Sequence, residues 1–299
     1  MKRLLFLGAM ALLLVACDQN EKPEQPENKE VYIPPQGVPI APMPQIQLQN
    51  NGGVDPTALG DSNGPVLRLE EGKPLDLSQL QGSGVSIAEH VASQIDSIRY
   101  KAEHGEANYQ YAYAVCYEKG WGVEQDLKEA LAWYNKSAEQ KCGPAYNSLG
   151  NFYRMGSGVT ADPKKAFEWY QKGAEEKDAQ AMLNLGNCFF YGMGTEKDEK
   201  TAVNWWKEAA DAGNAFAMAQ MGDCYYFGLG VEKNLAKAIE YYTPAADKNV
   251  TSALYRLGIL YYTGNGVDQD QTYSELLMRK ARDAGMKEAQ DFLDKNFKK

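Results

Sequence analysis

The chain has 299 residues, of which 44% are hydrophobic and 24% are charged, and its formal net charge is −9. This acidic balance argues against nucleic-acid binding, because phosphate recognition depends on clustered Lys and Arg side chains. The aromatic residues, 11% of the chain, are concentrated in its second two thirds, so we expect the folded part there.

The first sixteen residues form a predicted signal peptide. Lys2 and Arg3 give a basic start, and the apolar run over 4–15 is too short to cross a bilayer comfortably. The run leads into Leu-Val-Ala-Cys at 14–17, which resembles the lipobox of bacterial lipoproteins. The resemblance implies cleavage before Cys17, lipidation of Cys17 and a lipid anchor in the membrane. The alternative is an ordinary secretory signal with an incidental cysteine.

Asp18 follows the predicted lipidation site. An aspartate there is similar to the signal that retains lipoproteins in the inner membrane of some Gram-negative bacteria. We therefore expect a cell-envelope protein that faces the periplasm, with the inner membrane favoured over the outer membrane.

Residues 17–85 are interpreted as the acylated Cys followed by a disordered linker rich in Pro, Gln and Asn. No period of 2 or 3.6 residues survives in this stretch, and such a composition cannot bury enough apolar surface to offset the entropy of ordering it. The linker would hold the folded part away from the membrane. An alternative gives Val31–Pro35 a role as a docking peptide.

Five glycine pairs recur with a spacing of 36 residues and predict a helical repeat array. They are Gly120/Gly122, Gly156/Gly158, Gly192/Gly194, Gly228/Gly230 and Gly264/Gly266. Before the second pair, Ala145, Leu149 and Phe152 have the spacing of an amphipathic helix face. The glycines would end that helix in a tight turn.

A second helix is predicted to begin at a recurring cap residue in each repeat, at Asp126, Asp162, Asp198, Asn234 and Asp270. A metal site is not expected from this column, because the carboxylates of neighbouring repeats would be too far apart to share an ion. Two further columns are predicted to be core: Ala130, Ala166, Ala202 and Ala238, and the aromatics Trp133, Trp169, Trp205 and Tyr241.

The motif Leu-Gly-x-x-Tyr-x-x-Gly-x-Gly-Val, followed by Asp-x-x-x-Ala-x-x-Trp-Tyr, resembles the Sel1-like repeat family, which is related to the tetratricopeptide repeats. Five copies cover 107–286, with a half-repeat cap over 86–106 and a capping helix over 287–299. The resemblance implies an all-α, right-handed α-solenoid used for protein–protein contacts. Departures include Ala114 in place of glycine and a degenerate second helix in the fifth copy.

Four cysteines remain besides Cys17, namely Cys116, Cys142, Cys188 and Cys224. Three of them share one apolar repeat position, and neighbouring repeats place equivalent atoms about 10 Å apart, beyond disulfide reach. Buried thiols are therefore favoured over bridges.

The sequence predicts no enzyme, no cofactor and no small-molecule substrate. The only histidines, His90 and His104, lie outside the five full repeats, and no catalytic or phosphate-binding motif occurs. Some cysteine-rich relatives have been linked to β-lactam hydrolysis, but this chain has no Ser-x-x-Lys motif. A β-lactam-type hydrolase is therefore the least favoured alternative.

Partner binding is predicted on the concave face, at positions of the first helix opposite its buried side. The candidate residues are Tyr111, Asn147, Asn151, Arg154, Asn187, Phe190, Asp223, Tyr226, Tyr255 and Tyr262. Phe190, Tyr226 and Tyr262 would form an aromatic stripe; the alternative is that they pack on the next repeat.

These observations favour a lipid-anchored envelope scaffold that binds an unidentified envelope or secreted protein. A second hypothesis is a periplasmic immunity protein that neutralises a delivered antibacterial effector. A third is a component that helps to assemble a secretion or polysaccharide-export machine. The sequence alone does not separate these roles.

Overall fold

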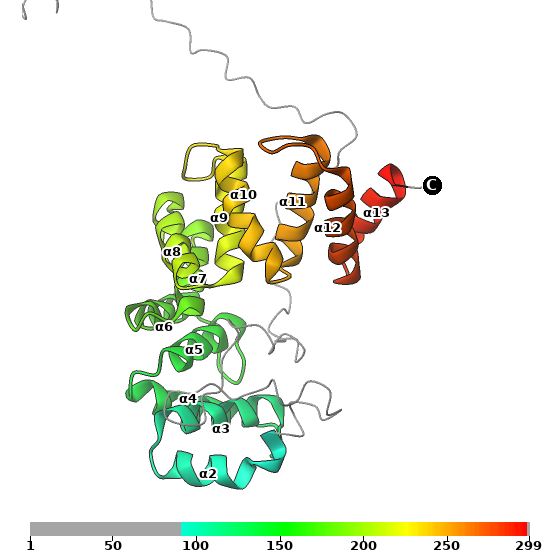
Figure 1. Ribbon diagram of the computed structural model, residues 1–299. Coiled ribbons are helices and arrows are strands. Elements are labelled where there is room, and N and C mark those ends of the chain that lie inside the picture. Colours follow the sequence, from blue (N-terminus) through cyan, green and yellow to red (C-terminus); the bar gives the residue numbers. More distant parts are fainter. Residues whose placement is uncertain (1–90, 298–299) are drawn as a thin grey trace, which may run out of the picture. The chain divides into compact units, whose positions relative to one another are not determined.

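The computed structural model describes residues 91–297, and all structural statements below concern this part of the chain. The predicted signal peptide, Cys17, Asp18 and the linker lie outside the described residues, as do residues 86–90 of the predicted N-terminal cap. Figure 1 shows the described part, which contains helices and no strand, in chain order from α2 in cyan to α13 in red.

Ten helices of 13 residues form five helix pairs, and one further helix lies at each end. The single helices are α2 (Ile95–Glu103) and α13 (Lys287–Asn296). The pairs are α3 (Ala107–Lys119) with α4 (Leu127–Glu139), α5 (Gly143–Met155) with α6 (Pro163–Glu175), α7 (Ala179–Tyr191) with α8 (Glu199–Asp211), α9 (Ala215–Phe227) with α10 (Leu235–Asp247), and α11 (Thr251–Thr263) with α12 (Gln271–Asp283).

The first helix of every pair ends at the first glycine of the repeated pair, as predicted. Gly156, for example, has φ 74°, and its amide donates to the Phe152 carbonyl at 2.8 Å. A left-handed residue at this point closes the helix, and glycine adopts that conformation without a steric penalty from Cβ. The chain then turns back toward the second helix.

The predicted caps of the second helices are confirmed. The Asp126 carboxylate accepts hydrogen bonds from the amides of Lys128 and Glu129 at 2.8 and 3.1 Å. Equivalent bonds occur at Asp162, Asp198, Asn234 and Asp270. Each cap satisfies amides at the start of the helix that have no partner within it.

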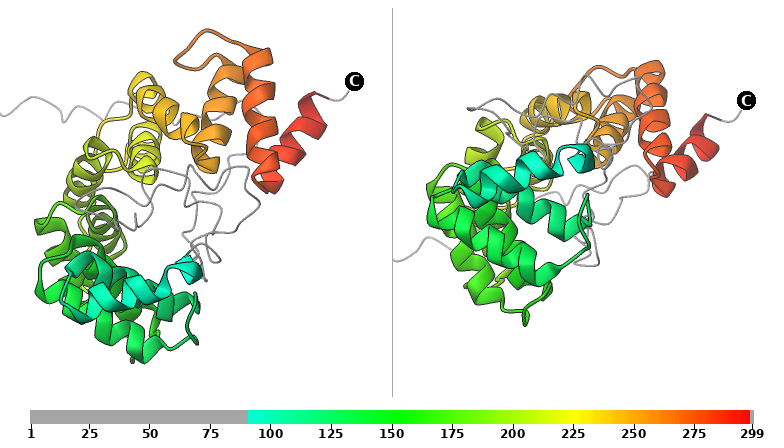
Figure 2. Two further views of the ribbon diagram at one scale, coloured as in Figure 1. Left: turned by 60° about the horizontal axis from the view of Figure 1, so that its bottom comes forward. Right: turned by 90° about the horizontal axis from the view of Figure 1, so that it is seen from below.

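The helices pack in sequence order, which makes the array an α-solenoid. Each helix contacts the one before and the one after it, and in Figure 2 the colours follow one another along the array without mixing. In addition, α5 contacts α7 and α9 contacts α11, so first helices of neighbouring repeats touch directly. We call the first helices the inner layer and the second helices the outer layer. None of the described helices combines the length and apolar character needed to span a bilayer.

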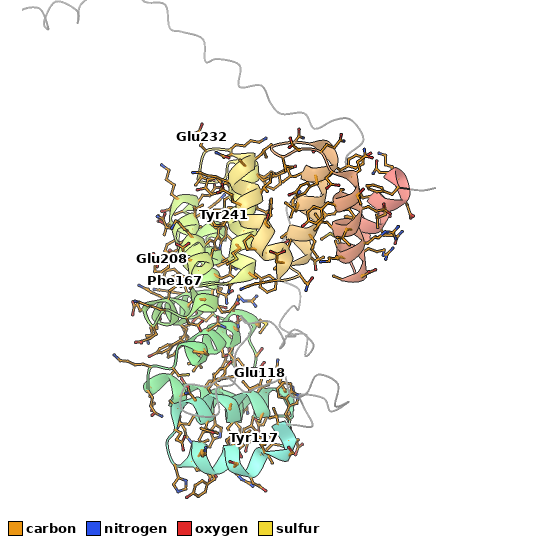
Figure 3. The ribbon with its side chains drawn as sticks, viewed as in Figure 1. Tyr117, Glu118, Phe167, Glu208, Glu232 and Tyr241 are labelled. Carbon is orange, nitrogen blue, oxygen red and sulfur yellow. The ribbon has the colours of Figure 1, made fainter. Side chains whose placement is uncertain are left out.

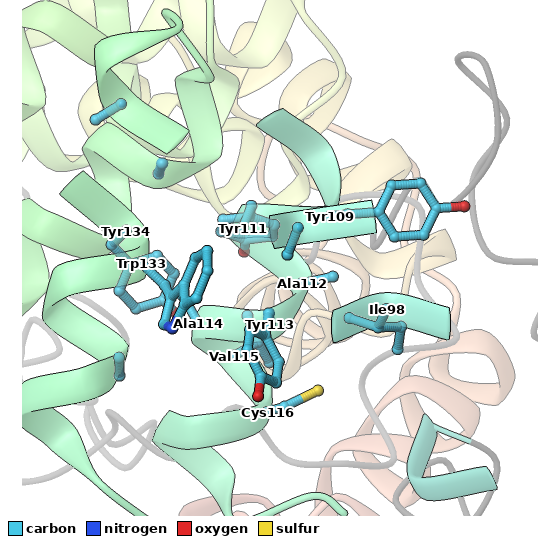
Figure 4. Packing of buried hydrophobic residues seen from close by; sticks show 14 of the residues in the cluster. Ile98, Tyr109, Tyr111, Ala112, Tyr113, Ala114, Val115, Cys116, Trp133 and Tyr134 are labelled. Atoms are coloured by element: carbon cyan, nitrogen blue, oxygen red, sulfur yellow. The ribbon is translucent and has the colours of Figure 1, made fainter. Parts of the chain in front are cut away.

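The prediction of the aromatic core was wrong by one position. Trp133 is buried, but Trp169, Trp205 and Tyr241 are only partly buried, and the Lys172 ammonium covers the Trp169 ring at 4.2 Å. The fully buried aromatics are the next residues along each outer helix: Tyr134, Tyr170, Trp206 and Tyr242. One residue rotates a helix by about 100°, which moves the later side chain onto the face toward the inner layer. Figure 4 shows Tyr134 beside Trp133 in the first repeat.

The fifth repeat and the last helix close the array. The outer helix of the fifth repeat, α12, has 13 residues like the other outer helices. Met278 takes the place of the buried aromatic, and the Ser274 hydroxyl donates to the Gly258 carbonyl at 2.8 Å. Helix α13 packs Phe292 against Tyr262 at a ring distance of 5.1 Å. The remaining surface of α13 is mostly charged, which suits a terminal cap.

Candidate functional site

In repeats two to four, a glycine in the inner helix leaves room for the buried aromatic ring of the outer helix to pack directly on the inner helix backbone. A Cβ on Gly186 would lie 2.5 Å from Cδ1 of Trp206, closer than such atoms approach in folded proteins. Gly150 faces Tyr170 and Gly222 faces Tyr242 in the same way. The Leu-Gly pair of the repeat motif thus allows a large ring to pass close to the inner helix backbone.

The polar tip of each crossing aromatic holds an acceptor on the inner layer. Tyr134 donates to Glu118 at 2.6 Å, Tyr170 to Asn151 at 2.8 Å, Trp206 to Asn187 at 3.1 Å and Tyr242 to Asp223 at 2.6 Å. The last three acceptors occupy equivalent positions one repeat apart. Buried Tyr and Trp side chains need such a partner for their O–H or N–H group, so the two layers are joined by a regular row of hydrogen bonds.

The fourth repeat adds a buried ion pair to this row. Arg256 Nε lies 3.4 Å from Asp223 Oδ1, and only 3% of Arg256 is exposed. The guanidinium group also lies over the rings of Tyr226 and Phe227, at 5.5 and 4.8 Å from their centroids. Burial raises the pKa of Asp223, whereas Arg256 and the Tyr242 hydroxyl hold it down. The pair ties α9 to α11 of the next repeat.

A second polar contact joins neighbouring inner helices. Asn184 Nδ2 of α7 donates to Asn147 Oδ1 of α5 at 2.8 Å. Asn147, Asn151 and Asn187 are partly exposed, and each uses its Oδ1 atom as an acceptor inside the protein. The inner layer therefore presents side-chain amide groups whose oxygen atoms are already engaged.

Aromatic side chains lie beside these amides at the C-terminal ends of α7 and α9. We define the aromatic cluster as two pairs of rings on neighbouring inner helices, Phe190 with Tyr191 on α7 and Tyr226 with Phe227 on α9. Phe190 packs on Tyr191 at 5.0 Å and on Trp206 at 5.1 Å, and Tyr226 packs on Phe227 at 4.8 Å. Tyr191 is 44% exposed. An exposed aromatic next to partly exposed ones is a common feature of surfaces that bind other proteins.

The structure separates the ten predicted binding residues into two groups. Tyr111, Asp223 and Tyr255 are buried, with exposed fractions of 3, 7 and 1%. The others are partly exposed: Asn147, Asn151, Arg154, Asn187, Phe190, Tyr226 and Tyr262. Asp223 and Tyr255 lie on α9 and α11, whose contact covers side chains that a single helix would expose. Tyr111 packs on Tyr134 of the outer helix of its own repeat, at a ring distance of 5.7 Å. Contact of any of these residues with a partner remains a prediction.

The alternative prediction was that the rings of the aromatic stripe pack on the next repeat. All three rings pack inside the protein, but two of them pack within their own repeat. Phe190 packs on Trp206 and Tyr226 on Tyr242, both within their own repeats. Tyr262 instead packs on the C-terminal segment, against Phe292 and Phe297, and its hydroxyl lies 3.2 Å from Asn296 Oδ1. Tyr262 therefore belongs to the cap rather than to the aromatic cluster.

The column of residues that ends each inner helix was not among the predicted binding residues. It contains Lys119, Met155, Tyr191, Phe227 and Thr263, which come directly before the helix-ending glycines. Met155 and Tyr191 are among the large apolar or aromatic side chains that are most exposed in the described part. The sequence did contain a signal for this column. Met155, Tyr191 and Phe227 are large and apolar or aromatic in three consecutive repeats, and each lies one helical turn after the position of Asn151 in its repeat.

The four cysteines of the array carry free thiols, and three of them are buried. Burial raises the pKa of Cys116, Cys188 and Cys224 to about 12. Such thiols are protonated at neutral pH and make poor nucleophiles. Within residues 91–297, no group of three His, Cys, Asp or Glu side chains could hold a metal ion.

Comparison with known proteins places the array among Sel1 repeat proteins. The Sel1 repeat model matches residues 105–142, 143–178, 179–214, 215–250 and 251–286. A protective antigen present in uropathogenic Escherichia coli strains is 32% identical, with a TM-score of 0.61 over 72% of this chain. The chain spans only 45% of that antigen's length. No curated protein gives a significant sequence match.

Two further solved structures are similar. A Sel1 repeat protein from Oxalobacter formigenes is 29% identical, with a TM-score of 0.62 over 69% of this chain and 88% of the other. An immunity protein from Pseudomonas aeruginosa is 20% identical over 72% of this chain and 82% of the other, and its TM-score of 0.48 carries no argument about function. Sel1-repeat solenoids are typically non-enzymatic scaffolds, and the fold supports a role in protein–protein interaction. The chain belongs to the Sel1 repeat family.

Proposed function

We propose that this chain is a lipid-anchored scaffold of the bacterial cell envelope that binds a protein partner on its inner layer. The observation that carries the proposal is the aromatic cluster beside partly exposed Asn151 and Asn187. These side chains come from consecutive repeats, so a partner that contacts all of them must extend across several repeats. Binding, rather than catalysis, is the function that this arrangement serves best.

The position of Tyr191 gives the proposal its chemical basis. Its ring is 44% exposed and lies beside Phe190, which is itself supported by the buried Trp206. A rigidly supported aromatic loses little conformational entropy when a partner covers it. On the outer layer, Glu208 of α8 is an exposed, charged side chain (Figure 3).

The membrane anchor and the periplasmic location rest on the sequence around Cys17. A thiol and an amino group that carry several acyl chains would anchor the chain stably, whereas a single chain gives only weak attachment. We expect radiolabelled palmitate to be incorporated into the native chain and not into a Cys17→Ser variant. Fractionation of the envelope then separates the favoured inner membrane from the outer membrane.

Site-specific crosslinking in the native host tests the binding surface. A photoreactive amino acid at Tyr191 of the inner layer is compared with the same amino acid at Glu208 of the outer layer, and the trapped proteins are identified by mass spectrometry. We expect a partner to be trapped from position 191 and not from position 208. Equal trapping from both positions, or trapping from position 208 alone, would contradict the proposed surface.

The identity of the trapped protein decides between the two roles. Several subunits of an envelope machine would support a scaffold. A single secreted effector, together with protection of the host from that effector, would support the immunity alternative instead.

A further inference from the structure

The partly exposed side-chain amides of Asn151 and Asn187 can still donate hydrogen bonds, because only their oxygen atoms are engaged. Asn151 Oδ1 accepts from the Tyr170 hydroxyl at 2.8 Å, and Asn187 Oδ1 accepts from Trp206 Nε1 at 3.1 Å. Within the described part of the chain, the Nδ2 groups of these two residues have no hydrogen-bond partner. They therefore remain available as donors.

The orientation of these amides is fixed by chemistry. An indole N–H can only donate, so the atom of Asn187 that faces Trp206 must be its oxygen. At Asn151, the Tyr170 hydroxyl donates to Oδ1 at 2.8 Å, so the oxygen of this amide faces the buried ring. Both NH₂ groups are thus oriented by buried neighbours before any ligand arrives.

The spacing expected for amides on two packed helices suits one type of peptide conformation. Asn151 and Asn187 occupy equivalent positions on packed inner helices, and packed helices lie about 8–10 Å apart. A polyproline II segment repeats every three residues, with a rise of about 3.1 Å per residue, so it presents a carbonyl on the same side about every 9 Å. Such a segment can direct successive carbonyls to successive amides.

Proline suits a surface that offers donors. A proline has a carbonyl acceptor and no N–H, so a proline-rich segment brings few donors that would be left without a partner. The exposed Tyr191 ring lies on the same helix as Asn187, four positions further along the chain, and aromatic grooves commonly receive proline rings in preformed extended peptides. The acceptors of the ligand and the donors of the protein are therefore complementary.

We infer that the inner layer recognises a proline-rich segment of a partner protein in the polyproline II conformation. The main-chain carbonyls of the segment accept from Asn151 and Asn187, and its rings pack on the exposed Tyr191. This inference rests on the proposed function, because it specifies the ligand of the same surface.

A synthetic peptide with the chemistry required provides the probe. Residues 31–48 of this chain have no charged side chain and contain five prolines, so we choose an 18-residue fluorescent peptide of that sequence. The protein is the full chain with Cys17→Ser, in which residues 31–48 are replaced by a Gly/Ser sequence of equal length. Binding is measured by fluorescence anisotropy. A second peptide has alanine at all five proline positions.

The decisive variant is the double substitution Asn151→Asp and Asn187→Asp. Each change keeps an oxygen for Tyr170 or Trp206 and replaces the free NH₂ donor by an acceptor. We expect the affinity for the proline peptide to fall by at least about tenfold, and the alanine peptide to bind at least about tenfold more weakly than the proline peptide. The matched control is Asn204→Asp on the exposed face of α8, which should leave the affinity unchanged.

Three results would overturn the inference. They are no measurable binding of the proline peptide, equal binding of the two peptides, or an affinity that the double variant leaves unchanged while its helicity is intact. A chain that keeps its native residues 31–48 is measured in parallel. If it binds the probe at least about tenfold more weakly, its own segment occupies the surface and the assignment to a partner protein is wrong. Crosslinking from Tyr191 can still succeed in each case, so the proposed function is tested separately.

Discussion

Trp206 of the outer layer donates a hydrogen bond from Nε1 to Asn187 Oδ1 of the inner layer, at 3.1 Å. The indole reaches this atom because it crosses α7 at Gly186. One side chain therefore fills the space between two helices and also orients an amide at the candidate binding surface. Stability and the proposed recognition therefore depend on the same side chain.

Gly186→Ala is expected to destabilise the fold. The new Cβ would lie 2.5 Å from Cδ1 of Trp206 and 3.1 Å from the Ala202 carbonyl oxygen, so the indole or the helix must move. Overpacking of this kind costs about 1–3 kcal/mol. Urea unfolding followed by circular dichroism measures the change in the free energy of unfolding. The first repeat provides a control, because it already has Ala114 at this position, and Ala114→Gly should cost about 1 kcal/mol or less.

Trp206→Phe is expected to affect both stability and binding. The phenyl ring keeps most of the packing but cannot donate to Asn187, which loses its fixed orientation. Loss of the hydrogen bond should lower the free energy of unfolding by about 1 kcal/mol, and the proline peptide should bind more weakly. Trp205→Phe is the matched control, since Trp205 is only partly buried and lies in the same helix. Equal effects of the two substitutions would argue against a special role for Trp206.

The regular features of the fold could be predicted from the sequence. Helix ends, caps and repeat boundaries depend on local chemistry, as at Gly156 and Asp162, and local chemistry repeats with the 36-residue period. The core aromatic was assigned to Trp169 instead of Tyr170, because both positions are aromatic and a pattern of adjacent apolar residues does not show which one faces the inner layer.

The candidate site could be predicted only in part. Asn151 and Asn187 were identified from their place on the inner helix. The sequence does not show that Tyr170 and Trp206 engage their oxygen atoms, because these contacts join residues 19 positions apart through three-dimensional packing. The burial of Tyr111 and Tyr255 also escaped prediction, since it depends on packing against other helices, with Tyr134 of α4 over Tyr111 and the contact of α9 with α11 at Tyr255.

The cap at Asp198 should make a pH-dependent contribution to stability. Hydrogen bonds from the Thr201 hydroxyl and the Thr201 and Lys200 amides lower the pKa of this carboxyl below 3.8. A lowered pKa in the folded state means that the contribution is present above the unfolded-state pKa, near 4, and is lost as the pH falls through the folded-state pKa. NMR titration of the carboxyl carbon measures that value. Asp198→Asn keeps the cap oxygen and should remove this part of the acid sensitivity; an unshifted Asp198 pKa would contradict the prediction.

The buried thiols should be unreactive until the protein unfolds. Because burial raises the pKa of Cys116, Cys188 and Cys224 to about 12, each thiol is deprotonated in about one molecule in 10⁴ at pH 8. We expect Ellman's reagent to react slowly with the native chain and rapidly with all four array thiols in guanidinium chloride. Cys142 is less buried and should react first. Immediate reaction of three or more thiols in the native protein would show that the repeats open readily.

The pair formed by Arg256 and Asp223 should be costly to break from one side. Arg256→Met leaves the Asp223 carboxylate buried without its cation, which costs about 3–5 kcal/mol. Burial already raises the pKa of Asp223, and loss of Arg256 should raise it further. A folded-state pKa above the unfolded value means that the folded state binds the extra proton, so stability falls as the pH rises through this interval. The deficit of the variant should therefore be smaller at pH 4.5 than at pH 7.

The double variant Arg256→Met with Asp223→Asn separates charge from packing. The asparagine keeps an oxygen that can accept from the Tyr242 hydroxyl and carries no charge, so most of the lost stability should return and the pH dependence should disappear. Urea unfolding of the native chain, both single variants and the double variant at the two pH values gives the complete cycle. The double variant is expected to be more stable than Arg256→Met alone. If the two are equally unstable, the loss comes from the packing of the guanidinium on Tyr226 and Phe227 and not from the uncompensated charge of the buried Asp223 carboxylate.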